Sequence, residues 1–142
     1  MQTKILTPDE KDIQIAGKIL AGGGLGAFPT ETVYGLGADA LNDGAVKNIY
    51  AAKGRPSDNP LIVHIAEKDD IKPLVKEVTP KAKALMDAFF PGPLTIILPK
   101  SDKVGKTVSG GLDTVAVRMP INETAHALIT VSYTHLTLPT IR

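Results

Sequence analysis

Apolar residues recur along the chain with two different spacings. A return every three to four residues predicts a helix, whereas a short apolar or alternating run predicts a strand. The predicted helices cover residues 8–21, 43–53, 69–76 and 79–90, and one more begins near residue 122. The predicted strands cover residues 25–28, 61–65, 94–98 and 114–118. Because helices and strands alternate, the pattern predicts an α/β domain.

Capping and breaker residues set the expected ends of these elements. Thr7-Pro8-Asp9-Glu10 is typical of a capping box with proline in the first helical position. Asp43 is expected to cap the second helix and Gly54 to end it. Residues 29–37, after the first strand, are expected to form a loop. The apolar face of helix 79–90 is expected to consist of Ala82, Leu85, Met86, Phe89 and Phe90.

Composition narrows the class of protein. A chain of 142 residues that is 43% hydrophobic and 22% charged suits one globular domain. A net charge of +1 gives no general attraction to nucleic acid or membrane. The absence of cysteine excludes disulfides, thiolate metal sites and a thiol nucleophile. No apolar run reaches the roughly 20 residues that span a bilayer, and the first residues carry no signal-peptide pattern, so we expect a cytoplasmic location.

Three polar clusters lie where predicted elements meet loops. They occupy residues 28–37, 53–64 and 114–120. Ligand sites of α/β proteins gather at such junctions. The three clusters together predict a site for an anionic small molecule.

The charged members of these clusters each allow two interpretations. Lys53 and Arg55 flank a glycine at a helix end, where they either reach a shared anion site or complement the helix dipole in solvent. His64 lies on an apolar strand, as a substrate contact or as a satisfied core residue. Arg118, at the end of a buried strand, needs an anion, and a substrate carboxylate fits.

The cluster 28–37 is equally open to interpretation. The hydroxyls of Thr30 and Thr32 either contact a ligand or cap a turn. Glu31 either orients the cations at positions 53 and 55 or is solvated. Tyr34 either lines an amino-acid pocket or fills core.

Motifs in a fixed order carry a family resemblance. They are Pro-Thr-Glu-Thr-x-Tyr-Gly-Leu, Lys-Gly-Arg-Pro, Asn-Pro-Leu-x-x-His, Phe-Pro-Gly-Pro-Leu-Thr and Thr-x-x-x-Arg-x-Pro. From Ile5 to Ile129 the chain resembles the YrdC-like family of L-threonylcarbamoyladenylate synthases. The resemblance implies a twisted mixed sheet flanked by helices, with a concave basic cavity. It also implies a reaction of L-threonine, bicarbonate and ATP that yields threonylcarbamoyl-AMP and pyrophosphate for modification of tRNA.

The resemblance also implies roles for individual residues, and we expect these residues to converge on one cavity. The positions matching threonine contacts are Thr32, His64 and Arg118, the last of which holds the carboxylate. The positions matching ATP contacts are Lys53, Arg55, Asn59 and Thr114, and the first two are the catalytic candidates. No metal cage is expected in the protein, so any Mg²⁺ accompanies the phosphates of ATP. The implied partners are tRNA and the threonylcarbamoyl-transferase machinery, with no membrane.

Two alternatives stay open at this point. One is an RNA-binding module, whose basic surface would draw on Lys53, Arg55, Lys72, Lys76, Lys81, Lys83 and Arg118. The other is an inactive, truncated piece of the enzyme.

The truncation hypothesis comes from the last twelve residues. Residues 131–142 contain no Asp, Glu, Lys or Gly and resemble a translated sequencing-adapter read-through. We therefore expect a YrdC-like domain over 1–130, incomplete at its C-terminus and lacking the family's later Ser-x-Asn motif. The tail over 131–142 is expected to be non-native and loosely packed, pairing at most with a sheet edge. The alternative is a genuine strand that ends in a turn.

Overall fold

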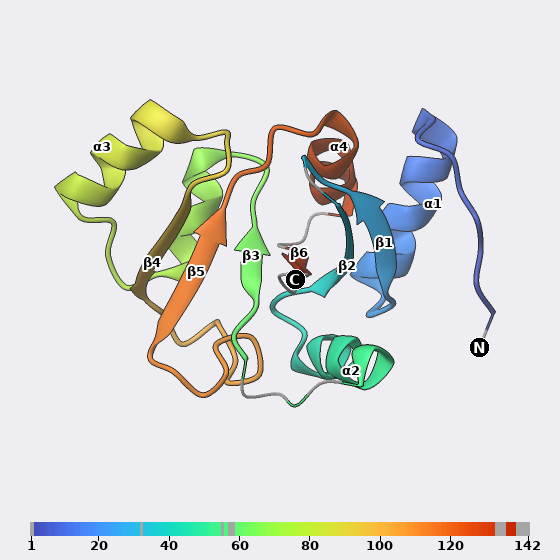
Figure 1. Cartoon of the computed structure of the whole chain (residues 1–142), viewed down its shortest axis with the longest axis horizontal. Helices are drawn as coiled ribbons and strands as arrows, with labels where there is room; N and C mark the ends of the chain where they lie inside the picture. Colours follow the sequence, from blue (N-terminus) through green and yellow to red (C-terminus); the bar gives the residue numbers. More distant parts are fainter. Residues whose placement is uncertain (1, 32, 55, 57–58, 133–135, 139–142) are drawn as a thin grey trace.

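A computed structural model of the chain describes residues 2–31, 33–54, 56, 59–132 and 136–138 (Figure 1). Among these residues, six strands form one sheet in the order β1-β2-β6-β3-β5-β4. The strands are β1 (Gly26–Pro29), β2 (Tyr34–Asp39), β3 (Ile62–His64), β4 (Thr95–Pro99), β5 (Thr114–Arg118) and β6 (Leu136–Leu138). The helices are α1 (Glu10–Ala21), α2 (Asp43–Lys53), the 3₁₀ helix η1 (Lys68–Leu74), α3 (Pro80–Phe89) and α4 (Glu123–Ser132).

The sheet is mixed, as the resemblance implied. Strands β3 and β5 run parallel, and the other described pairs are antiparallel. Strand β2 returns beside β1 as a hairpin, so part of the expected loop 29–37 is strand. The loop prediction is wrong there because the turn closes early: the N–H of Thr30 donates to the carbonyl of Val33 at 3.1 Å.

The cap of α1 lies two residues later than predicted. Asp9 is the N-cap residue, and its carboxylate accepts from the N–H of Asp12 at 2.8 Å. The Thr7 hydroxyl donates to Asp9 and to Asp12 at 2.7 and 3.1 Å. Thr7 therefore supports the cap from outside the helix, because Asp9, in an extended conformation just before the helix, itself accepts from the unpaired N–H of Asp12.

Helix α2 begins and ends close to its predicted limits. Asn42, rather than Asp43, is the N-cap residue and accepts from the N–H of Ala45 at 3.1 Å. Gly54 ends the helix with φ 62°, a left-handed conformation that glycine adopts without strain. Lys53 is therefore the last helical residue, as predicted.

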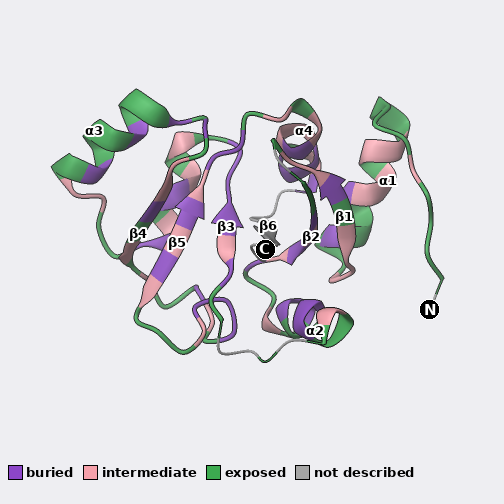
Figure 2. Ribbon diagram, viewed as in Figure 1, coloured by how far each residue is buried: buried purple, intermediate pink, exposed green. Residues whose placement is uncertain are grey.

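Only one side of the apolar face predicted for α3 is buried. Ala82, Met86 and Phe90 are buried, whereas Leu85 is 37% and Phe89 56% exposed. The helix lies at the β4 side of the molecule, with much of its surface exposed (Figure 2). A helix packed along one side buries an i, i+4 row and leaves the neighbouring row outside.

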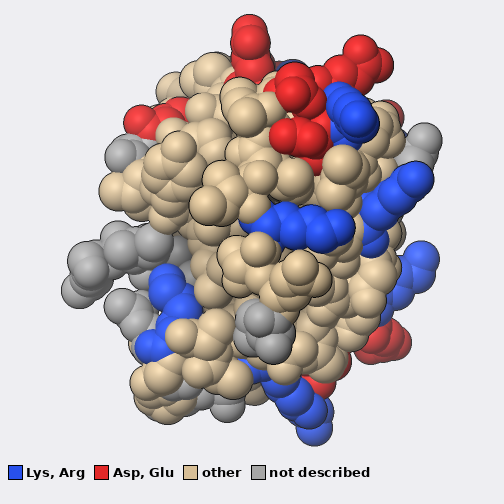
Figure 3. Space-filling model, turned by 90° about the vertical axis from the view of Figure 1, so that its right-hand side faces the viewer, with Lys and Arg blue, Asp and Glu red and all other residues tan. Residues whose placement is uncertain are grey.

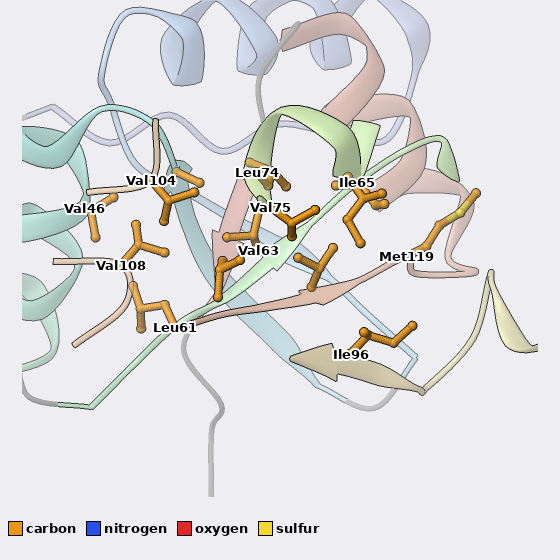
Figure 4. Close-up of a cluster of buried hydrophobic side chains, with 14 of the residues drawn as sticks. Val46, Leu61, Val63, Ile65, Leu74, Val75, Ile96, Val104, Val108 and Met119 are labelled. Atoms are coloured by element: carbon orange, nitrogen blue, oxygen red, sulfur yellow. The ribbon is translucent and has the colours of Figure 1, made fainter. Parts of the chain in front are cut away.

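The main core lies on one face of the sheet. Val63 of β3 and Val117 of β5 belong to the same buried cluster as Leu74 of η1. The loop between β4 and β5 adds Val104 and Val108 to this cluster (Figure 4). Burying each such side chain contributes about 1.5–3 kcal/mol. A second cluster joins α1, β1 and α4 through Leu20, Phe28, Ala125, Leu128 and Ile129.

Strand β6 lies inside the sheet, between β2 and β3 (Figure 1). Ala38 of β2 pairs with Thr137, and so does Val63 of β3. The expectation of a position at the edge is wrong for residues 136–138, because an alternating segment there pairs two strands that would otherwise leave backbone groups unsatisfied. Residues 131 and 132 continue α4, and Ser132 is buried.

No helix in the described ranges is both long and apolar enough to cross a bilayer.

Candidate functional site

His64 and Arg118, two of the predicted threonine contacts, are direct partners in the parallel pairing of β3 and β5. Side chains at directly paired positions project from the same face of a sheet. The alternate residues Val63 and Val117 project from the other face and are fully buried in the core. His64 and Arg118 therefore lie side by side on the face turned away from that core.

The two described residues assigned only to ATP lie near the opposite end of these strands. Thr114 shares the face of Arg118, but it begins β5 and lies four residues, about 13 Å, away along the strand. Asn59 lies three residues before β3. Because β3 and β5 run parallel, Asn59 approaches the end of this strand pair at which Thr114 lies. The structure thus separates the predicted contacts into a threonine end and an ATP end, and their convergence on one cavity stays a prediction.

The catalytic candidates are only partly described. Lys53 ends α2, and its Nζ atom is buried. Arg55, the second catalytic candidate, and Thr32, the third threonine contact, lie outside the described residues.

His64 is a buried neutral imidazole. Its side chain is 3% exposed, and its Nδ1 lies 3.0 Å from the carbonyl oxygen of Ile62. Burial, helped by the charge of Arg118, lowers the pKa of His64 to about 4, against the opposing effects of Ile62 and Glu31. Because a carbonyl oxygen only accepts, the ring proton is assigned to Nδ1, which leaves Nε2 as an acceptor. The site can therefore receive a hydrogen-bond donor at this ring.

Arg118 has an internal anion. Its NH2 group forms an ion pair with the carboxylate of Glu31, and its Nε donates to the carbonyl of Gly92 at 3.2 Å. The Arg118 side chain is 16% exposed and that of Glu31 is 23% exposed. The buried cation expected from the sequence thus has a partner from the protein itself.

Glu31 also accepts two backbone hydrogen bonds at the start of α4. Its Oε1 accepts from the N–H of Ile121 at 2.6 Å and from that of Asn122 at 3.2 Å. Burial alone would raise the pKa of Glu31, but these N–H groups and the charge of Arg118 hold it below its ordinary value. Among the described residues the cation that Glu31 contacts is Arg118, so the solvated interpretation is wrong. Arg55, one of the two cations that Glu31 was expected to orient, lies outside the described residues.

The other polar residues of the first motif are placed as well. The hydroxyl of Thr30 donates to the carbonyl of Val33 at 2.6 Å and so caps the β1–β2 turn. Tyr34 is 69% exposed, which excludes the core interpretation.

Sequence reasoning missed the polar role of Tyr50. Tyr50 is 6% exposed on α2, and its hydroxyl donates to the carbonyl of Asn59 and lies 3.3 Å from that of Thr107. It therefore ties α2 to the segment that follows the Lys-Gly-Arg-Pro motif. The sequence feature that could have indicated this role is a tyrosine at a core position of a helix, nine residues before Asn59, because a buried tyrosine hydroxyl usually has a hydrogen-bond partner.

The basic residues invoked for RNA binding are partly neutralised. Lys72 pairs with Asp69, and Lys83 with Asp87, each at 3.2 Å. On the side shown in Figure 3, acidic side chains gather at the top, and basic ones lie in the middle and below.

No group of three His, Cys, Asp or Glu side chains within the described ranges is arranged to hold a metal ion.

Comparison with known proteins extends this picture. A model of the Sua5/YciO/YrdC family, described as "Telomere recombination", matches residues 18–141. The threonylcarbamoyl-AMP synthase of Pyrococcus abyssi is 53% identical over 131 residues, which make up 92% of this chain and 38% of that protein. The Bacillus subtilis protein of the same name is 53% identical over 128 residues, 89% of this chain and 37% of its own length. The chain therefore spans less than two fifths of these relatives.

Solved structures share the fold. The crystal structure of P. abyssi Sua5 complexed with L-threonine matches with a TM-score of 0.90 at 53% identity, covering 93% of this chain and 39% of that one. Escherichia coli YciO matches in fold with a TM-score of 0.82 at 23% identity, covering 96% of this chain and 66% of its own. With a family model that covers most of its length, this chain belongs to the Sua5/YciO/YrdC family.

Proposed function

We propose that this chain carries the active-site face of an L-threonylcarbamoyladenylate synthase. The reaction joins L-threonine, bicarbonate and ATP into threonylcarbamoyl-AMP and releases pyrophosphate. The product would then serve threonylcarbamoyl transfer to tRNA. The observation that carries the proposal is the pairing of His64 with Arg118 on the face of the sheet turned away from the main core, in a chain 53% identical to synthases of that name.

The threonine end of this face suits an amino acid. Arg118 offers N–H groups to a carboxylate, and His64 offers a neutral acceptor to an ammonium or hydroxyl group. The P. abyssi relative was crystallised with L-threonine, which supports threonine as the amino acid. We assign Thr32, His64 and Arg118 to this substrate from the resemblance of their motifs.

The ATP end suits a polyphosphate. Adenylation requires a carbamate oxygen to attack the α-phosphate while pyrophosphate leaves, so the protein must position the reactants and stabilise spread negative charge. We assign Lys53 and Arg55 to that stabilisation, with Asn59 and Thr114 as nucleotide contacts. Mg²⁺ is placed on the phosphates of ATP, in keeping with hard oxygen ligands.

The test is release of pyrophosphate from ATP by the purified chain, with and without L-threonine and bicarbonate. The proposal expects release that requires both and a product with the mass of threonylcarbamoyl-AMP. Release of pyrophosphate that does not depend on threonine would overturn the proposal. Salt-sensitive binding of tRNA with no pyrophosphate release would instead favour the RNA-binding alternative, and absence of both would favour the inactive fragment.

We also keep as a proposal the division into a domain over 1–130 and a non-native tail over 131–142. Composition supports it, whereas the match to residue 141 and the pairing of β6 favour the alternative of a genuine strand. Genomic DNA across codon 130 tests it. A reading frame that continues into a Ser-x-Asn motif is expected, and one that encodes the tail as written would overturn the division.

A further inference from the structure

The carboxylate of Glu31 joins three parts of the chain. Glu31 lies in the β1–β2 turn, Arg118 ends β5, and Ile121 and Asn122 precede α4. One carboxylate oxygen pairs with the guanidinium, and the other takes both backbone N–H groups. Three donors from beyond the turn therefore fix the position of this side chain.

The same contact fixes Arg118. The Arg118 guanidinium is held on one side by the carbonyl of Gly92 and on another by Glu31. These contacts use two of the five N–H groups of an arginine, which leaves three among the contacts made by described residues. A guanidinium held in one orientation loses less conformational entropy when it binds a second carboxylate.

We propose that Glu31 is a positioning residue for Arg118, holding the guanidinium beside His64 so that its remaining N–H groups receive the carboxylate of the amino-acid substrate. This inference rests on the proposed function for the identity of the substrate. The Arg118 guanidinium is largely buried, so it also needs a counter-charge when no substrate is present, and Glu31 supplies it. The contrasting role, a carboxylate that blocks Arg118 until substrate displaces it, predicts the opposite effect on affinity.

The decisive variant is Glu31→Gln. An amide of the same size still accepts from the N–H groups of Ile121 and Asn122, but its NH₂ group cannot accept from Arg118. We expect the KM for L-threonine to rise about tenfold, the loss of one charge-assisted hydrogen bond. The KM for ATP and the kcat at saturating threonine should change less than threefold.

Glu123→Gln is the matched control. It removes one negative charge from the first turn of α4 without touching Arg118. It therefore separates the loss of the Arg118 contact from a general weakening of the helix dipole interaction. The conservative variant Glu31→Asp keeps the charge on a shorter side chain and should give an intermediate KM.

A second measurement does not depend on catalysis. The chain has three arginines, so the ¹⁵Nη–H signals of Arg118, which include the group that contacts Glu31, can be assigned by their loss in Arg118→Lys. Exchange of these protons with solvent should be slow in the parent chain and several-fold faster in Glu31→Gln, and unchanged in Glu123→Gln.

These readouts separate the two proposals. If the parent chain does not use threonine, the proposed function fails, and the exchange rate still tests the positioning. Unchanged exchange in Glu31→Gln, or in Glu31→Asp should the amide variant not fold, overturns the positioning role. A lower KM for threonine in Glu31→Gln overturns it in favour of the blocking role.

Discussion

His64 on β3 and Arg118 on β5 stand opposite each other in the sheet, so a buried neutral imidazole lies beside a guanidinium that is already paired. The arrangement allows both to remain on a largely covered face without an uncompensated charge. Acid, or loss of either partner of the ion pair, should disturb it in ways that can be measured.

The protonation of His64 should make the domain acid-sensitive. Its pKa is about 4 in the folded chain, below the ordinary value of 6.5. Between these values the unfolded chain binds a proton at this residue and the folded chain does not, so stability is lost as pH falls from 6.5 toward 4, by up to about 3 kcal/mol. Urea unfolding at several pH values should show this slope, flattened in His64→Gln. His126→Gln changes a half-exposed histidine and serves as the control. A His64 variant that kept the parent slope would contradict the assignment.

Removing the guanidinium should weaken binding of threonine more than binding of ATP. In Arg118→Ala the substrate carboxylate loses its charged partner, and Glu31 is left without its cation. We expect a loss of about 2–5 kcal/mol in threonine binding, as for other buried charge pairs. Calorimetry with each ligand measures this, with the exposed Lys81→Ala as control. Equal losses for both ligands would make Arg118 a structural residue.

Removing one hydroxyl should loosen the segment that follows α2. Tyr50→Phe loses the hydrogen bond to Asn59 and the polar contact with Thr107. We expect the free energy of unfolding to fall by about 1 kcal/mol. Trypsin should cleave after Lys53 several-fold faster, as measured by mass spectrometry. Tyr34→Phe removes an exposed hydroxyl, and trypsin should cleave this variant at the parent rate. Unchanged cleavage in Tyr50→Phe would show that its hydroxyl does not hold the segment.

A small substitution on α1 should test whether α4 is packed beyond residue 130. A Cβ atom at Gly17 would lie 2.7 Å from the Cγ2 atom of Val131 and 3.3 Å from the backbone nitrogen of Ser132. We expect Gly17→Ala to lower the free energy of unfolding by about 1–3 kcal/mol through overpacking.

The partner variant makes this test specific. Val131→Ala in the Gly17→Ala background should restore part of the loss, measured as a coupling energy in a double-mutant cycle. Additive effects would mean that the two residues do not touch, as expected if residues 131 onward were loosely packed.

Local signals predicted most of the elements. Strand β5 has the predicted limits, and Gly54 ends α2 as expected, because period and breaker residues act within a few positions. The cap of α1 and the buried side of α3 were predicted wrongly. Several nearby residues could each cap α1, and two rows of apolar residues on α3 could each be buried, so the choice depends on neighbouring groups in the fold. The hairpin return of β2 depended on a turn closed by Thr30, which the composition of the segment did not reveal.

The site was harder to predict because its contacts join distant parts of the chain. The pairing of β3 with β5 brings His64 to Arg118 across 54 positions of sequence. Glu31 meets Arg118 across 87 positions. Residue type alone showed that Arg118 needs an anion, but only the fold shows that a carboxylate of the chain already supplies one.

On the alternative that residues 136–138 are a genuine strand, the interior position of β6 links the joining of the described sheet to the order of synthesis. Among the described strands, β6 is made last, yet it joins the β1–β2 hairpin to the group β3-β5-β4. Until residue 138 has left the ribosome, these two parts share no strand pairing and expose facing edges. Contacts between strands about a hundred residues apart close slowly, so we expect both edges to stay exposed and prone to association until β6 pairs. A chaperone that binds unpaired strands would therefore act on the nascent chain before residue 138 emerges.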